Sequence, residues 1–395
     1  MLVSTPRCDY FEAGRCRSCT FIETPIVEQL GRKEARCREL LPSVPAAGWL
    51  PIVGGGDRDF RNKAKLVVGG AAGAVTLGIL GPDGAGVDLR DCLIQEPAIR
   101  AVIPRLARLL DATGLAPYSV PRRRGELKYV HVTAAPSGEL MLRFVVRSEE
   151  GLSRIRARLA ELRATVPEAA VISVNLLPEH VALLEGEREE LLLGSSLTME
   201  LGDVSLHLRP QSFFQTNTAV ARELYGQATR WVERFDPASI WDLYCGVGGF
   251  ALACAPRSSP DSGSGSDSGA ARRVLGVELS AAAVASAERS ARDAGIDARF
   301  VAADATAFAL GAANEALPEL VIVNPPRRGI GAELAAWLDG SDVPSVIYSS
   351  CNPESLARDL AALPGYRVCE ARVFDMFPHT GHLEVMVLLE RAARV

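Results

Sequence analysis

No stretch of this 395-residue chain is apolar for long enough to cross a membrane. A membrane helix needs about 20 consecutive apolar residues, and no run in the sequence approaches that length. The first residues, Met1 to Ser4, lead into Pro6, Arg7 and Cys8 instead of the apolar core of a signal peptide. We therefore expect a globular protein that does not enter a membrane and that works in the cytoplasm.

The chain also lacks an excess of positive charge, since 43 Lys and Arg face 48 Asp and Glu for a formal net charge of -5. This balance argues against a protein that coats nucleic acid indiscriminately, but it leaves room for local basic patches. A run of basic residues can equally be a solvated face or a phosphate contact, and both interpretations stay open. The candidates are Arg58, Arg61, Lys63 and Lys65, then Arg122, Arg123, Arg124 and Lys128, and finally Arg327 and Arg328.

The nine cysteines are an odd number spread over a long chain. This pattern fits a reducing compartment better than a disulfide scaffold. Their distribution is uneven, because Cys8, Cys16 and Cys19 form a C-x7-C-x2-C cluster and Cys92 follows much later. Three close thiols and a distant fourth can hold zinc or an iron–sulfur cluster, and the spacing does not choose between them. The alternative is a set of free thiols in an irregular segment. Cys37 lies in a helical pattern and is expected to pack.

The pattern of helices and strands divides the chain into three expected regions. Residues 1–59 hold the cysteine cluster and one charged helix over Val27–Leu41. Residues 60–202 are expected to form an α+β domain with mainly antiparallel strands. Its expected helices are Ala98–Ala112 and Leu152–Thr165, and its expected strands are Ala64–Val68, Val75–Leu80, Lys128–Ala134, Leu140–Val146, Val171–Leu177 and Val181–Glu185.

Residues 203–395 alternate helix and strand, which predicts an α/β domain with a doubly wound, mostly parallel sheet. A segment rich in Ser and Gly at 256–272 interrupts this domain and is expected to be a flexible insertion, because it has too little apolar surface to order itself. The expected helices are Thr218–Phe235 and Ala281–Ala294, and the expected strands are Ile240–Tyr244, Val274–Glu278, Arg299–Ala302, Leu320–Asn324, Val346–Ser350 and Leu383–Leu389.

A glycine-rich turn follows the first strand of this domain, in the segment Asp242–Phe250. Gly246 and Gly248 would let a ligand approach the backbone closely. The next strand ends at Glu278, where a carboxylate can accept hydrogen bonds from ribose hydroxyls. Asn324 begins an Asn-Pro-Pro-Arg segment after a later strand. Together these features resemble the Rossmann-like S-adenosylmethionine methyltransferases rather than dinucleotide oxidoreductases.

Cys351 directly follows the apolar strand Val346–Ser350. This position places its sulfur at the carboxyl edge of a parallel sheet, where open α/β folds hold their ligands. A thiolate there is a candidate nucleophile beside a bound cofactor. The alternative is that Cys351 is a small buried apolar residue, as isolated cysteines often are.

A cysteine and a carboxylate are the groups that methylation of uracil at carbon 5 needs. Carbon 5 is a poor nucleophile, so a thiolate must first add at carbon 6, and a base must later remove the carbon-5 proton. Glu384 lies in an apolar strand, where desolvation would raise its pKa toward that of a useful base. His382 is two residues away and is expected to contact Glu384. Alternatively, Glu384 is paired with an arginine at a strand end.

The order of these motifs resembles that of the uracil-C5 RNA methyltransferases. Phe60–Lys65 and Arg124–Tyr129 are similar too, so the resemblance covers nearly the full length. Within this family the four N-terminal cysteines are similar to the branch that carries a [4Fe–4S] cluster and acts on 23S ribosomal RNA, without a leading β-barrel domain. The matching motifs are Arg209–Asn217, the glycine-rich turn, Asn324–Arg327, Ser349–Asn352 and His382–Glu384.

The resemblance implies a role for each matching residue. It makes Cys351 the nucleophile and Glu384 the base. We expect the cluster to be structural and to tie the N-terminal loop to the loop of Cys92, because methyl transfer includes no redox step. We also expect a monomer without an obligate protein partner. The implied cofactor residues for S-adenosylmethionine are Gln215, Tyr244, Glu278, Asn324, Asp304, Gly246 and Gly248, and the implied cluster ligands are Cys8, Cys16, Cys19 and Cys92. Tyr244 replaces a more usual phenylalanine.

Several interpretations remain open from the sequence. Phe213 and Phe214 either hold a flipped base or belong to the core. The substrate is expected to be one uridine of 23S ribosomal RNA, with another ribosomal site or a tRNA as the alternative. Two rivals are an amino-group methyltransferase, which would need neither Cys351 nor Glu384, and a non-catalytic iron–sulfur protein that binds RNA.

Overall fold

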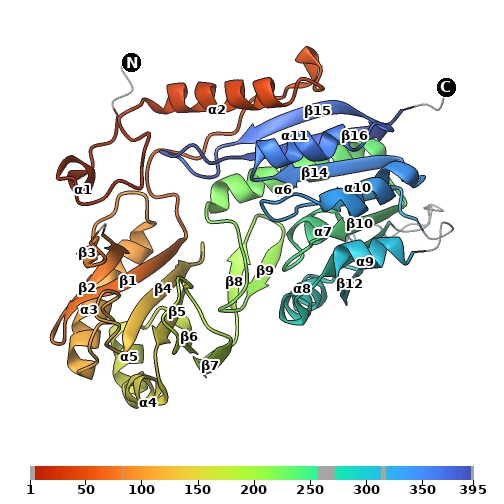
Figure 1. Ribbon diagram of the computed structural model, residues 1–395. Coiled ribbons are helices and arrows are strands. Elements are labelled where there is room, and N and C mark those ends of the chain that lie inside the picture. The colour runs from red at the N-terminus through yellow and green to blue at the C-terminus, as the bar shows by residue number, and fades with distance from the viewer. Residues whose placement is uncertain (1–4, 82, 257–271, 313–316, 393–395) are drawn as a thin grey trace. The chain divides into compact units, whose positions relative to one another are not determined.

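The computed structural model describes residues 5–81, 83–256, 272–312 and 317–392 (Figure 1). The chain forms two compact units, the first from Met1–Glu23 and Gly56–Met199 and the second from Thr24–Gly55 and Glu200–Val395. Residues 24–55, which the sequence places in a separate N-terminal region, therefore fold with the C-terminal half. Most of the expected flexible insertion, residues 257–271, lies outside the described residues.

The first unit is built on a seven-stranded sheet of order β3-β2-β1-β4-β5-β6-β7. Every neighbouring pair is antiparallel except β5 and β6, which confirms the expected mainly antiparallel domain. The strands are Lys63–Ala71 (β1), Ala74–Leu80 (β2), Gly86–Asp88 (β3), Leu127–Ala134 (β4), Leu140–Val146 (β5), Ala169–Leu176 (β6) and Arg188–Leu193 (β7), and a short helix, Asp9–Glu12 (α1), precedes them.

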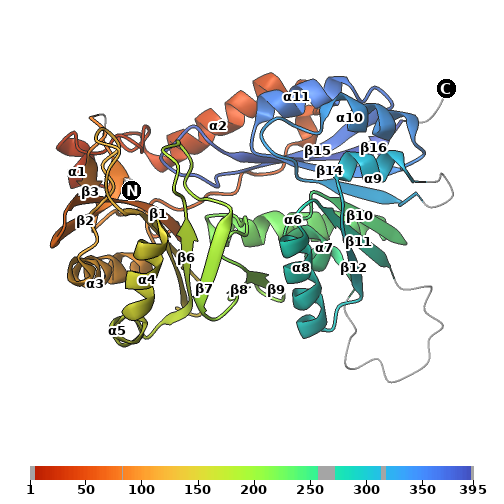
Figure 2. The ribbon, with the colours of Figure 1, turned by 60° about the horizontal axis from the view of Figure 1, so that its bottom comes forward.

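Three helices cover one face of this sheet: Pro97–Thr113 (α3), Glu149–Ala157 (α4) and Leu159–Thr165 (α5) (Figure 2). Leu66 of β1, Phe144 of β5 and Ile103 of α3 belong to the apolar core between the helices and the sheet. The alternation of buried and accessible residues along β1 follows the two-residue period of a strand with one covered face.

Two expected elements of this unit differ in the structure. The strand expected at Val181–Glu185 is wrong, because this segment is an irregular connection whose Val181 and Leu183 side chains are exposed, and the strand lies later, at β7. Glu185 and Glu189 both bind Arg143, so the connection is fixed by charge instead of by a strand pairing of its own. The single expected helix over Leu152–Thr165 is broken at Arg158 into α4 and α5.

The second unit is built on a seven-stranded sheet of order β12-β11-β10-β13-β14-β16-β15. Strands β12 to β14 run parallel in this order, and β16 is antiparallel to both of its neighbours, which confirms the expected doubly wound α/β fold. The strands are Ser239–Leu243 (β10), Arg273–Glu278 (β11), Ala298–Ala302 (β12), Leu320–Val323 (β13), Ser345–Ser350 (β14), Tyr366–Phe374 (β15) and Glu384–Arg391 (β16).

Helices on both faces bury the central strands, so that every residue of β10, β13 and β14 is buried. The helices of this unit are Ile26–Leu40 (α2), Thr218–Phe235 (α6), Gly249–Cys254 (α7), Ala281–Ala294 (α8), Ala305–Leu310 (α9), Gly331–Gly340 (α10) and Pro353–Ala361 (α11), with a 3-10 turn at Ala46–Gly48 (η1). A two-stranded ribbon of Leu197–Glu200 (β8) and Ser205–Leu208 (β9) is formed where the ranges of the two units meet in the sequence. Among the described residues, no helix combines the length and apolarity that a membrane span requires.

Helix α2 and the segment after it belong to the edge of this second sheet (Figure 1). The helix contacts β15 and α11, and Cys37 packs in the core as expected. After the 3-10 turn, Leu50 N donates to Ala371 O at 2.8 Å and Val53 N donates to Val373 O at 2.9 Å. The N-terminal segment therefore runs along β15 as an added edge.

Candidate active site

The carboxyl ends of the parallel strands bring the predicted residues to one edge of the second sheet. Tyr244 follows β10, Glu278 ends β11 and Asp304 comes two residues after β12. On the other side of β10, Asn324 follows β13 and Cys351 follows β14. The strand order reverses between β11 and β13, on either side of β10, which is where doubly wound sheets bind their ligands.

The glycine-rich turn after β10 uses a backbone conformation that few side chains tolerate. Tyr244, Gly246 and Gly248 have φ of 66°, 54° and 87°. The Gly246 amide donates to Glu278 Oε2 at 3.1 Å, and the Ser280 amide donates to Oε1 at 2.9 Å. These two bonds hold the Glu278 carboxylate beside the turn, and its contact with a ribose stays a prediction.

Asp242, inside β10, is a further candidate site residue that was not singled out from the sequence. Its Oδ2 accepts a hydrogen bond from the Ala251 amide at 2.9 Å, which ties the start of α7 to the strand. Its Oδ1 is buried and has no partner among the described residues. Burial raises the pKa of Asp242 to about 8, and the nearby charge of Glu278 acts in the same direction. A carboxylate within an apolar strand just before a glycine-rich turn was the available sequence signal.

The nucleophile candidate Cys351 is half-buried directly after β14. Burial raises the pKa of its thiol, as does the charge of Glu384, while the Arg327 guanidinium lowers it by its charge and a hydrogen bond. Asn352 Nδ2 donates to Arg327 O at 3.2 Å, so the loop of the arginine is tied to the loop of the cysteine. A cation beside a thiol favours the reactive thiolate. The sequence had suggested Arg327 only as a possible RNA contact.

The base candidate Glu384 lies on the strand next to this cysteine. Because Ser350 pairs with Val385 in the antiparallel register of β14 and β16, Cys351 and Glu384 occupy the next opposed positions. The Glu384 side chain is 2% exposed, and the Ser349 hydroxyl donates to its Oε1 at 2.6 Å. Burial raises the pKa of Glu384 to about 7, against the effect of the Ser349 hydrogen bond. This value suits a general base near neutral pH.

His382 was expected on the same strand as Glu384. It lies instead in the loop before β16. Its ring meets Phe377 edge-on with a centroid distance of 6.2 Å. The hydrogen bond of Glu384 goes instead to Ser349, on the neighbouring strand. The two-residue period fails here because β16 begins only at Glu384.

The remaining predicted cofactor residues lie near structural caps. Asp304 is the N-cap of α9, where its Oδ1 accepts from the Ala307 amide at 2.9 Å. Gln215 is buried two residues before Asn217, the N-cap of α6. The contacts of both with a cofactor stay predictions. The neighbouring phenylalanines have different environments, with Phe214 5% and Phe213 74% exposed, so Phe214 is core and only Phe213 is open to a ligand.

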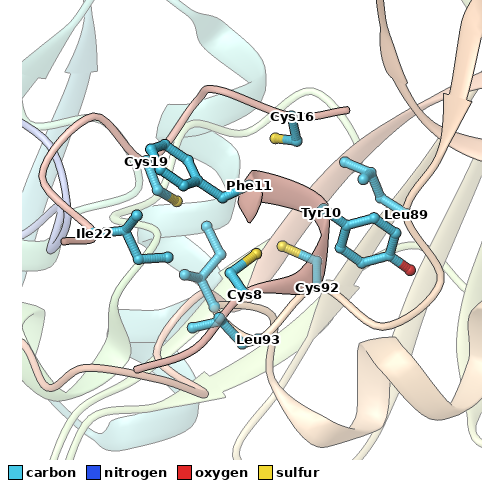
Figure 3. A pocket seen from close by; sticks show the side chains of 10 residues that line it. Cys8, Tyr10, Phe11, Cys16, Cys19, Ile22, Leu89, Cys92 and Leu93 are labelled. Carbon is cyan, nitrogen blue, oxygen red and sulfur yellow. The ribbon is translucent and has the colours of Figure 1, made fainter. Parts of the chain in front are cut away.

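The four clustered cysteines line one pocket of the first unit (Figure 3). The rest of the lining is apolar or aromatic and comes from Tyr10, Phe11, Ile22, Leu89, Leu93 and Ile94. Burial, and to a smaller extent the charges of Cys92, Cys16 and Cys8, raise the pKa of Cys19 to about 12. Within the described ranges, no group of three or more His, Cys, Asp or Glu side chains converges as a metal-ion site. The geometry alone therefore assigns no metal.

The predicted basic patches differ in their accessibility. Arg58, Lys65 and the run Arg122–Arg124 are exposed, and Arg61 is partly buried. Lys63 is partly buried, and burial lowers its pKa to about 8. Lys128 is buried, donates to Glu179 O at 2.5 Å and lies over the Tyr118 ring. The exposed residues are thus the remaining candidates for phosphate contact in this unit.

The sequence matches a known family over just over half of its length. Residues 192–392 match the tRNA (uracil-5-)-methyltransferase family. The 23S rRNA (uracil(747)-C(5))-methyltransferase RlmC of Halothiobacillus neapolitanus is 47% identical over 388 residues, covering 97% of this chain and 99% of that protein. The chain belongs to the uracil-5 RNA methyltransferase family. A relative of the same name from Edwardsiella ictaluri is 46% identical, and the match covers 98% and 99% of the two chains.

A solved member of the family has a similar structure. The tRNA (uracil-54, C5)-methyltransferase of Pyrococcus abyssi, crystallised with S-adenosyl-L-homocysteine, superposes with a TM-score of 0.76 and 25% identity. The superposition covers 95% of this chain and 84% of the Pyrococcus chain. The family and the fold confirm the expected uracil-5 methyltransferase and argue against the amino-group alternative.

Proposed function

We propose that this chain transfers a methyl group from S-adenosylmethionine to carbon 5 of one uridine in 23S ribosomal RNA, equivalent to the position 747 in the names of its relatives. The opposed positions of Cys351 and Glu384 on β14 and β16 carry this proposal. The near-complete coverage of relatives with that name supports the choice of RNA. A ribosomal RNA substrate also agrees with the expected cytoplasmic location, and the expected monomer stays a prediction.

The reaction follows from the chemistry of the ring. The Cys351 thiolate adds to carbon 6 of uracil, the carbon 5–carbon 6 double bond opens, and its electron pair makes carbon 5 nucleophilic. S-Adenosylmethionine, once bound, would supply an electrophilic methyl group to carbon 5, and the broken sulfur–carbon bond would leave S-adenosylhomocysteine as the product. Glu384 then removes the carbon-5 proton, the double bond re-forms and the Cys351 thiolate leaves. The Arg327 guanidinium favours the Cys351 thiolate both when it attacks carbon 6 and when it leaves.

The residues around the glycine-rich turn suit an adenosyl ligand. The left-handed glycines of the turn leave the backbone of β10 open to a close ligand, and Glu278 is held with its carboxylate beside that turn. The unpaired, buried Oδ1 of Asp242 marks the same turn as a place where a polar ligand or an ordered water would complete the hydrogen bonding. Gln215, Tyr244, Asn324 and Asp304 are proposed to complete the pocket.

We also propose that Cys8, Cys16, Cys19 and Cys92 hold a [4Fe–4S] cluster. Each thiolate of such a cluster binds a different iron, so the four sulfurs are expected around a cavity instead of converging on one point. Their shared apolar pocket fits this arrangement (Figure 3). The Tyr10 hydroxyl accepts a hydrogen bond from the Asp91 amide at 3.1 Å, which already joins the two segments that the cluster would bridge. Its role would be structural, since methyl transfer includes no redox step.

A transfer assay with methyl-labelled cofactor tests the substrate and the nucleophile together. The 23S fragment around the target uridine should be methylated, and a tRNA transcript should not. The tRNA arm is needed because the solved Pyrococcus relative is named for a tRNA uridine. Cys351→Ala should abolish transfer, while Cys369→Ala, a half-buried thiol of β15, should leave it intact.

A trapping experiment tests the covalent step independently. RNA with 5-fluorouridine at the target position has no removable proton at carbon 5, so the wild-type protein should remain covalently bound to it on a denaturing gel. Methylation by Cys351→Ala, or the absence of a trapped complex with an otherwise active wild-type protein, would overturn the proposed mechanism. An active wild-type protein that methylates only tRNA would overturn the proposed substrate.

A further inference from the structure

The buried side of helix α2 is polar, which is unusual for a helix that packs on a sheet. Gln29, Lys33 and Cys37 follow one another at four-residue intervals and are all buried, with Lys33 2% exposed. On the accessible side of the helix, Arg32 pairs with Glu28 at 2.6 Å and Arg38 with Glu34 at 2.7 Å, while Arg36 pairs with Glu354 of α11. A buried ammonium group is costly unless it is paired and hydrogen-bonded, so the surroundings of Lys33 must compensate for its burial.

Apart from Thr24 O, which accepts from Gln29 Nε2 at 2.8 Å, the hydrogen-bond partners described here for Gln29 and Lys33 lie in the loop between β15 and β16. Lys33 Nζ donates to Asp375 Oδ1 at 2.5 Å and to Phe377 O at 3.0 Å. Gln29 Oε1 accepts from the His379 amide at 2.8 Å, and Gln29 Nε2 lies 3.2 Å from His379 Nδ1. Burial lowers the pKa of Lys33 and raises that of Asp375, and the charge of each partner opposes these shifts.

This loop begins and ends beside the proposed base. Phe374, the last residue of β15, pairs with Glu384, the first residue of β16, so residues 375–383 close the hairpin at the position of the base. Asp375 N also donates to Val53 O at 2.8 Å, which fixes the start of the loop from a second side. His379 has a φ of 62°, a conformation that its two bonds to Gln29 help to hold.

Stability alone does not explain the Lys33–Asp375 pair. Replacing a buried ion pair by apolar residues of similar volume is often neutral or stabilising, so such pairs are weak contributors to the free energy of unfolding. A directional pair does, however, restrict where the hairpin end can lie. A displacement of about 1 Å at a catalytic group can cost about a hundredfold in rate.

We propose that Lys33, acting through Asp375, is a positioning residue that holds the Glu384 end of the β15–β16 hairpin opposite Cys351. Gln29 supports the same loop through His379. This inference rests on the proposed function, because it assigns Lys33 to the step that Glu384 performs. It predicts a defect in proton removal, after the methyl group has been transferred, and not in cofactor binding or in attack by the thiolate.

The test separates these steps with target RNA that carries tritium at carbon 5 of the uridine and with methyl-labelled cofactor. In Lys33→Met, methyl transfer to the RNA in a single turnover should stay within about threefold of wild type. Tritium release should fall about tenfold or more, and the covalent protein–RNA complex should accumulate. Arg32→Met, which removes an exposed cation from the adjacent position of the same helix, should leave both rates within about twofold.

Two further variants make each outcome decisive. Lys33→Arg keeps the charge and should recover part of the tritium release. Lys33→Met/Asp375→Leu removes the ion pair without leaving a lone buried charge, so it should fold like the wild type and still release tritium slowly. Wild-type tritium release by either folded methionine variant overturns the positioning role, as does failure of both to fold, which would assign the pair to folding. A wild-type protein without methyl transfer would instead refute the proposed function.

Discussion

The two seven-stranded sheets of this protein place their reactive residues in different ways. In the second unit, five parallel strands end at one edge, and the turn after each strand brings a polar or nucleophilic side chain to that edge. In the first unit, the mainly antiparallel strands have no such shared edge, and the four cysteines come from loops. Parallel strands therefore gather reactive side chains at one edge of the sheet. In the antiparallel unit, the reactive side chains lie in the loops around the sheet.

If this difference is correct, substitutions in the second unit should change the reaction, and substitutions at the cysteines should change metal content and stability.

Glu384→Gln should lower turnover by about a thousandfold, because an amide cannot accept the carbon-5 proton. The covalent complex with ordinary RNA should then accumulate, since the addition and methyl transfer precede the missing step. Single-turnover kinetics on denaturing gels would measure both effects. Glu390→Gln, on the same strand, is the matched control and should turn over normally. Near-normal turnover by Glu384→Gln would show that the base lies elsewhere.

Arg327→Met should slow covalent capture of 5-fluorouridine RNA about tenfold at pH 7. Loss of the guanidinium removes the group that lowers the pKa of Cys351, so less thiolate is present. Capture should recover as the pH is raised, because the thiol then ionises without the arginine. Arg328→Met controls for lost RNA affinity. An equal loss in both variants, without recovery at high pH, would assign Arg327 to RNA binding.

The rate of proton removal should fall as the pH drops through about 7, because Glu384 must be ionised to act as a base. Ser349→Ala removes a hydrogen bond that favours the ionised carboxylate, so the pKa of Glu384 should rise. The acid limb of the profile should therefore move to higher pH. Tritium release from a preformed adduct, measured from pH 5.5 to 9, would show this shift. An unchanged limb would mean that another group titrates.

Cys16→Ser should have the smallest effect on the chemistry of the second unit. Anaerobically purified protein should lose iron and the visible absorption of the cluster, and the first unit should unfold at a lower temperature. Cys369→Ser, which changes a thiol of the second unit, should keep the wild-type iron content. Bound zinc in place of iron would overturn the cluster proposal. Lost methyl transfer with folding and RNA affinity intact would overturn its structural role.

Much of the second unit could be predicted because its signals are local. The helices Thr218–Phe235 and Ala281–Ala294 have the predicted bounds, since each begins at a side-chain cap and keeps a helical period throughout. The position of Cys351 at the end of its strand was also readable. The wrong strand at Val181–Glu185 shows the limit of this approach, because a short apolar run predicts a strand only if a neighbouring strand is available to pair with it.

The sequence by itself determined the fold class and indicated the candidate nucleophile, the candidate base and the glycine-rich turn, because these depend on short segments with a fixed period or spacing. Only the tertiary structure decided which distant residues act together. Lys33 and Asp375 are 342 positions apart in the sequence. Glu384 accepts its hydrogen bond from Ser349 on the neighbouring strand. The physical reason is that burial and strand register, and not neighbouring residues, set the partners, the pKa and the position of these groups.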